Sequence, residues 1–147
     1  MVDRETLISS FDQTLAKTHR WLDDLDTSLG WHDRERCYHA LKAVLHALRD
    51  RLPVAEAVDL GASLPMLVRG FYYEGWQPAG TPRKYRDKEH FLAQVRHRAS
   101  WLEPDDAERV VTAVFALLMS EIGGGEPGQV RHLLPPEIRE LWPLRGL

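Results

Sequence analysis

The sequence predicts an all-α domain built from two similar helical units. Apolar residues recur at three- and four-residue intervals along almost the whole chain, and the alternation that marks a β-strand is nowhere sustained. In addition, residues 19–72 align without a gap with residues 89–142 after a shift of 70 positions. The alignment contains nine identities in 54 pairs, where ordinary composition gives about three.

These identities and the length of the chain together predict one domain. At 147 residues the chain is near the usual size of a single domain, so two halves are expected to share one core. We therefore predict a pseudo-twofold bundle over residues 1–147, with repeats of about 4–76 and 87–142 joined by a connector, 75–86. The identical pairs are Trp31/Trp101, Leu22/Leu92, Ala43/Ala113, Val44/Val114, Leu48/Leu118, Glu56/Glu126, Leu64/Leu134, Pro65/Pro135 and Arg69/Arg139.

Each repeat is expected to contain a first helix and then a long helix. In the first repeat, the apolar spacing predicts one helix over about residues 4–29, or two abutting helices, and Gly30 ends it. Asp33 is suited to cap the long helix that follows, whose apolar stripe continues to Pro53. In the second repeat, Asp87 caps the first helix and Pro104 lies in the first turn of the long helix.

Two short helices complete each repeat. The third helix begins near Pro53 in the first repeat and near Gly125 in the second, where Gly123–Gly125 ends the long helix before it. A Leu-Pro step then interrupts the chain, because proline disfavours helical geometry in the preceding residue but suits the first turn of a new helix. The restarted helices are predicted at Pro65 to about Tyr73 and at Pro135 to about Trp142.

Composition restricts the classes of function. A net charge of −3 gives no overall attraction to nucleic acid or to anionic membranes. The one cysteine, Cys37, excludes an internal disulfide framework. No apolar run is long enough to cross a bilayer, and no targeting segment is recognised at the amino terminus, so we expect a cytoplasmic protein.

Three segments show a family resemblance. They are Leu48–Ala57, the run Leu-Pro-(x)3-Arg-Gly-(x)-Tyr-Tyr-Glu-(x)-Trp that begins at Leu64, and Leu134–Trp142. The chain resembles, from about Phe11 to Trp142, the small bacterial helical proteins grouped as domain of unknown function 2267. The resemblance implies a helical fold and a bacterial, cytoplasmic setting. It implies no activity and no catalytic residues.

The aromatic run after the first Leu-Pro step is the first candidate site. At helical spacing Arg69 shares a face with Tyr72 or Tyr73, and it can also pair with Glu74. With Trp76, these residues predict an aromatic-walled surface for a small ligand or a peptide. The alternative is that the rings fill the seam between the repeats, which the recurrence of Arg69 as Arg139 favours.

The basic connector is the second candidate site. Arg83, Lys84, Arg86 and Lys88 surround a single tyrosine and could engage phosphate groups. No recognition helix accompanies them, which argues against nucleic acid as a partner, and the charges equally suit a solvated loop.

Signals for catalysis, metal binding and cofactors are absent from the sequence. His39 and His46 lie two helical turns, about 10 Å, apart, which is too far for one ion without a ligand between them. No glycine-flanked nucleophile and no phosphate loop occurs, since Gly123–Gly125 follows a helix and no Lys-Ser or Lys-Thr comes after it. We therefore predict no catalytic residues, no metal and no cofactor.

Two functional hypotheses follow. The first is a non-enzymatic interaction module that presents Tyr73, Glu74, Trp76 and the connector to a protein or small ligand. The second is a small enzyme or ligand sensor with a pocket at the seam, using Arg69, Tyr72 and Glu74. Surplus apolar helix surface also makes a homodimer one possible assembly.

Overall fold

The protein folds into an all-α bundle, and its computed structural model describes residues 8–122 and 126–143. Within those ranges the chain forms helices and turns and no strand, which confirms the predicted fold class. The helices are α1 (Ser9–Leu29), α2 (Arg34–Arg51), α3 (Val54–Ala62), α4 (Met66–Tyr73), a short 3-10 helix η2 (Pro78–Gly80), α5 (Lys88–Arg98), α6 (Pro104–Glu121), α7 (Glu126–Leu133) and α8 (Pro136–Arg139).

Local signals account for most helix ends. Gly30 adopts a left-handed φ of 71° and its N–H donates to the Asp26 carbonyl at 2.7 Å, which closes α1. The Asp33 carboxylate caps α2 by accepting the Arg36 N–H at 3.1 Å. Asp87 caps α5 in the same way, accepting the His90 N–H at 2.7 Å. Over residues 9–29 α1 is one uninterrupted helix, so the alternative of two abutting helices is wrong there.

Two predicted helix ends are not matched by a described helix end. The last helix ends at Arg139, three residues before the predicted end at Trp142. The chain continues in tight turns, in which the Leu141 and Trp142 N–H groups donate to carbonyls three residues back. The expected stop at Gly123–Gly125 lies outside the described residues, as do residues 4–7 of the first predicted helix.

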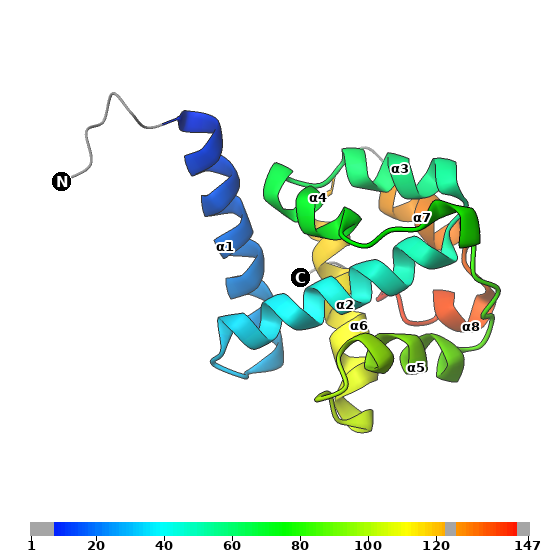
Figure 1. The fold of residues 1–147 in the computed structure, drawn as a ribbon. Helices are drawn as coiled ribbons and strands as arrows, with labels where there is room; N and C mark the ends of the chain where they lie inside the picture. Colours follow the sequence, from blue (N-terminus) through cyan, green and yellow to red (C-terminus); the bar gives the residue numbers. More distant parts are fainter. Residues whose placement is uncertain (1–7, 123–125, 144–147) are drawn as a thin grey trace.

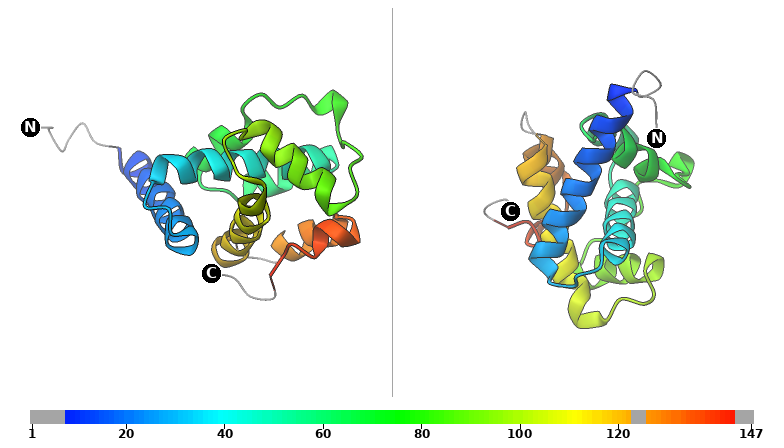
Figure 2. Two further views of the ribbon diagram at one scale, coloured as in Figure 1. Left: turned by 90° about the horizontal axis from the view of Figure 1, so that it is seen from below. Right: turned by 90° about the vertical axis from the view of Figure 1, so that its left-hand side faces the viewer.

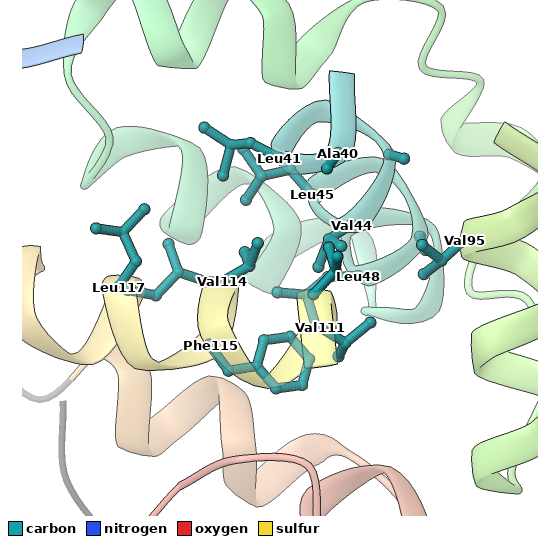
Figure 3. Close-up of a cluster of buried hydrophobic side chains, with 14 of the residues drawn as sticks. Ala40, Leu41, Val44, Leu45, Leu48, Val95, Val111, Val114, Phe115 and Leu117 are labelled. Carbon is teal, nitrogen blue, oxygen red and sulfur yellow. The ribbon is translucent and has the colours of Figure 1, made fainter. Parts of the chain in front are cut away.

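The core lies where α2 crosses α6. Figure 3 shows apolar side chains of the two long helices meeting at this crossing, with Val95 of α5 at its edge. From α2 come Ala40, Leu41, Val44, Leu45 and Leu48, and from α6 come Val111, Val114, Phe115 and Leu117; all are buried. Burying this apolar surface is the main stabilising contribution to the fold.

The helices of the two predicted repeats interleave. Helix α1 packs on α6 of the other half, and α5 packs on α2, while α3 lies beside α7 (Figures 1 and 2). Two units related by a twofold axis would give this pattern of neighbours. The repeat itself stays a prediction, which requires that residues 19–72 superpose on residues 89–142.

None of the helices in the two described ranges combines the length and hydropathy needed to span a lipid bilayer.

Candidate functional site

The tyrosines of the predicted aromatic surface lie against α3. Tyr72 is fully buried and its hydroxyl donates to the Ala57 carbonyl at 2.6 Å. Tyr73 is half-buried and its hydroxyl lies 3.5 Å from the Val58 carbonyl. Both rings approach Gly61, where a Cβ would lie only 2.7 Å from the Tyr73 Cζ and 3.1 Å from the Tyr72 Cε2. The absence of a side chain at Gly61 therefore lets the two tyrosine rings of the α4 segment pack closely against α3.

The Arg69 side chain caps the carboxyl end of α3. Its Nε donates to the Gly61 carbonyl at 2.9 Å and its Nη2 to the Leu64 carbonyl at 3.0 Å. Arg139 makes the corresponding bond, from Nη2 to the Leu134 carbonyl, at the same distance of 3.0 Å. Free carbonyls at helix ends require such donors, so this arginine has a structural role.

The expected pair between Arg69 and Glu74 is not formed. The Glu74 carboxylate is exposed and lies 3.5 Å from the Lys42 ammonium group. Arg69 is instead engaged by carbonyls at the end of α3 and in the turn that follows it. Trp76 packs on Tyr73 with ring centroids 5.4 Å apart, and its buried Nε1 has no acceptor among the described residues. The five residues therefore do not converge on one pocket.

A polar hollow, here called the seam pocket, lies between α2, α5 and the connector. Its volume is about 530 Å³. The floor consists of Arg49 and Asp50 from α2 and Arg98 from α5. The rim includes Glu74, Gln77 and Arg83, so it joins one residue of the predicted aromatic surface to one residue of the predicted basic patch.

The floor is a buried ionic network. Asp50 Oδ1 accepts Arg49 Nε at 2.9 Å, and Asp50 Oδ2 accepts Arg98 Nη2 at 2.7 Å. Arg49 is 3% and Asp50 is 6% exposed, while the Arg98 side chain is 18% exposed. Arg49 Nη1 also donates to the Tyr72 and Glu74 carbonyls at 2.7 and 3.0 Å, which holds the end of α4 against α2. The network thus joins α2, α4 and α5 in one rigid arrangement.

Comparison with family models places most of the chain in one family. Residues 18–141 match the model of an uncharacterized conserved protein family, DUF2267. The chain belongs to this family. No curated protein matches the sequence.

The basic connector of this DUF2267 protein is divided among different environments. Arg83 lines the seam pocket, and its backbone N–H donates to the Asp50 carbonyl at 2.7 Å. Lys88 faces away and pairs with Glu108 at 3.0 Å. Lys84 and Arg86 are exposed. The four predicted residues therefore do not act as one patch.

Tyr85 anchors the connector beneath these charges. It is 3% exposed, and its hydroxyl donates to the Ala47 carbonyl. Burial is the main cause that raises the pKa of Tyr85 well above its usual value, so the phenol stays protonated. The anchored tyrosine positions Arg83 at the pocket rim.

His46 is a further pocket residue with a defined proton. Its Nε2 lies 2.7 Å from the Phe71 carbonyl, and because a carbonyl only accepts, Nε2 carries the hydrogen. Burial lowers the pKa of His46, and the Arg49 charge adds to this, although the Phe71 hydrogen bond acts in the opposite direction. His46 is therefore neutral at physiological pH and presents Nδ1 as an acceptor.

The single cysteine of the DUF2267 chain lies in the core. Cys37 is fully buried, and burial, with Asp26 and Asp33 nearby, raises the pKa of its thiol to about 12. No group of three or more histidine, cysteine or acidic residues in the described ranges is placed to hold a metal ion.

Sequence reasoning missed Arg49, Asp50 and Gly61. The first two lie between Leu48 and Leu52, whose four-residue spacing keeps the apolar stripe intact, so the pattern assigns them to the solvent face and gives no sign of their burial. Nothing in the sequence connects Asp50 to Arg98, which lies 48 positions away.

The amino-terminal part of α1 exposes an apolar face. The side chains of Phe11 and Leu15 are exposed beside Met66 and Leu67 of α4. The offset of 70 places the start of α5, Lys88, opposite Thr18, so residues 9–17 of α1 have no counterpart in the second half.

Proposed function

We propose that this protein is a non-catalytic ligand-binding module and that the seam pocket is its site. One observation carries the proposal: the connector and the segment after α4, predicted separately as binding surfaces, meet in this hollow through Glu74 and Arg83. Its volume of about 530 Å³ lies in the range of small-molecule sites, about 300–1,000 Å³.

The pocket residues differ between the two halves. Under the offset of 70, Arg49 corresponds to Met119, Asp50 to Ser120 and Arg98 to Ser28. Packing positions such as Arg69 and Leu64, by contrast, recur as Arg139 and Leu134. Charged side chains found in one half alone are not needed by the repeated architecture, which favours a role in binding.

The chemistry of the floor favours binding over catalysis. Both oxygens of Asp50 accept hydrogen bonds from arginines, so this carboxylate is not available as a general base. His46 offers only Nδ1, since Nε2 donates to Phe71. We retain the bacterial cytoplasm as the expected setting, on the basis of the family resemblance.

The test is a small-molecule screen by thermal shift, followed by native mass spectrometry. Gln77 is exposed on the pocket rim, and a Gln77→Trp variant would fill the hollow without touching the core. Gln129→Trp, at an exposed position of α7 that does not line the pocket, is the matched control. We expect compounds that stabilise the wild type and Gln129→Trp but not Gln77→Trp. Equal stabilisation of all three proteins, or no binder of any class, would contradict the proposal.

A second candidate is self-association through the apolar face of α1 and α4, which the exposure of Phe11, Leu15, Met66 and Leu67 favours. Sedimentation velocity over a range of concentrations tests it. A dimer that is lost in Phe11→Ser/Leu67→Ser would support this assembly, and a monomer at all concentrations would contradict it.

A further inference from the structure

The seam pocket carries an excess of positive charge over a floor that is largely dehydrated. Two guanidinium groups, the buried Arg49 and the partly buried Arg98, share the single carboxylate of Asp50. Arg83, which also lines the hollow, carries a third guanidinium group. The other carboxylate of the lining, Glu74, is paired with Lys42. Because removing an unbalanced charge from water is costly, an anion in the pocket would be bound favourably.

The donors needed to hold an anion remain unused. Arg49 bonds through Nε and Nη1, and Arg98 through both Nη atoms, which leaves Arg49 Nη2 and Arg98 Nε without hydrogen bonds among the described residues. The Arg83 guanidinium likewise makes no hydrogen bond or ion pair with another described side chain or carbonyl. These donors belong to three separate elements that line one hollow: α2, α5 and the connector.

We propose that the seam pocket binds the phosphate group of a small phosphorylated molecule through Arg49, Arg98 and Arg83. This inference rests on the proposed function and adds the class of ligand. Donors from three separate elements suit the several oxygens of a tetrahedral phosphate better than a planar carboxylate, which one arginine can satisfy with a bidentate pair. The hollow is larger than inorganic phosphate, so the remaining volume accommodates an organic group, for which Gln77 and Thr81 of the rim provide polar contacts.

Calorimetry at constant ionic strength tests the ligand class. The probes are glycerol 3-phosphate, inorganic phosphate, citrate and glycerol, with chloride replaced as each anion is added. We expect glycerol 3-phosphate to bind more tightly than inorganic phosphate, and glycerol not to bind. Inorganic phosphate binding as tightly as glycerol 3-phosphate would identify the free anion as the ligand and remove the organic group from the proposal. Binding of citrate alone would overturn the phosphate assignment.

Two arginine variants locate the site. Arg83→Gln removes one donor that makes no structural side-chain contact, and we expect it to weaken glycerol 3-phosphate binding about tenfold. Arg86→Gln removes the same charge from an exposed connector position outside the pocket and should leave affinity within about twofold. Equal weakening by both variants would indicate diffuse attraction to the connector and would overturn the proposal.

A nuclear magnetic resonance titration gives a readout that is independent of affinity. The Nε–H resonance of Arg98 should shift as phosphate is added, while the backbone amide of Lys84 should not. The screen could yield compounds that no longer bind when Gln77→Trp fills the pocket, while no phosphate compound binds. That result would support the ligand-binding function and reject phosphate as the ligand class. No binder of any class would reject both.

Discussion

Trp31 and Trp101, which the offset of 70 makes equivalent in sequence, are in direct contact. Their ring centroids are 5.9 Å apart in an edge-to-face arrangement, and the Arg36 guanidinium lies 4.2 Å from the Trp31 centroid and 5.2 Å from that of Trp101. Equivalent residues that touch each other lie beside the axis that relates their units. We therefore place the proposed pseudo-twofold axis through this pair and through the crossing of α2 and α6.

The interleaved packing predicts one cooperative unfolding transition for the chain. Helix α1 packs on α6 and α5 packs on α2, so neither half can bury its own apolar surface. Urea unfolding followed by the fluorescence of the five tryptophans, which are spread over both halves, should coincide with unfolding followed by circular dichroism. Residues 1–76 produced alone should lack a cooperative transition. Two separated transitions in the intact chain would indicate two domains.

Gly61→Ala should destabilise the protein by about 1–3 kcal/mol, because the added methyl group would overlap the Tyr73 ring and crowd the buried Tyr72. In a Tyr73→Ala background the same change should cost much less, since the ring with the closest contact is gone and alanine is the better helix former. Urea denaturation of the four proteins of this cycle measures the coupling. Equal costs in both backgrounds would mean that Tyr73 does not set the requirement for glycine.

Asp50→Asn should cost about 3–5 kcal/mol of stability, because it leaves the buried Arg49 and the partly buried Arg98 without their shared counter-charge. Asp59→Asn, at an exposed position of α3, is the control and should change stability by less than about 0.5 kcal/mol. Chemical denaturation measures both. A small effect of Asp50→Asn would show that the network is not stabilised by its carboxylate.

Stability should fall as the pH is lowered below about 6.5. Burial lowers the pKa of His46 in the folded protein from its ordinary value of 6.5, so the unfolded chain takes up a proton that the folded chain does not. The contribution is therefore fully present above the unfolded pKa and declines as the pH falls towards the folded pKa. His46→Gln should flatten this dependence, whereas His97→Gln, at an exposed position of α5, should leave it unchanged. Denaturation midpoints between pH 5 and pH 8 provide the measurement.

Cys37 should be unreactive in the native protein. The thiol is fully buried and its pKa is raised to about 12, so almost no thiolate forms at pH 8. Labelling with a chromogenic disulfide reagent should be slow in buffer and rapid in denaturant. Rapid labelling of the folded protein would mean that α2 opens locally around this position.

Helix boundaries could be predicted from the sequence because the signals that end helices act within one turn. Asp33, Asp87 and Gly30 behave as their types and positions indicate. The end of α8 could not, since the final turns are held by a distant contact in which the Trp142 ring stacks on Phe115 with centroids 4.3 Å apart. The helix propensity of the residues near the chain terminus gives no information about such a long-range contact.

The candidate site was predictable only in part for the same reason. Glu74 and Arg83 were named because aromatic and basic runs surround them in the sequence. Their partners Asp50 and Arg98 belong to different helices and meet only in the folded protein. Periodicity identifies which residues share a helix face, and it does not show which faces meet.

The connector between the halves has a consequence for stoichiometry. Gln77, Thr81 and Arg83 belong to a segment that a duplicated chain contains once, because two units need a single link. Trp31 has Trp101 as its counterpart under the offset of 70. The hollow that the connector residues border has no such counterpart elsewhere in the chain. Titrations should therefore saturate at one molecule bound per polypeptide, whatever symmetry its scaffold retains.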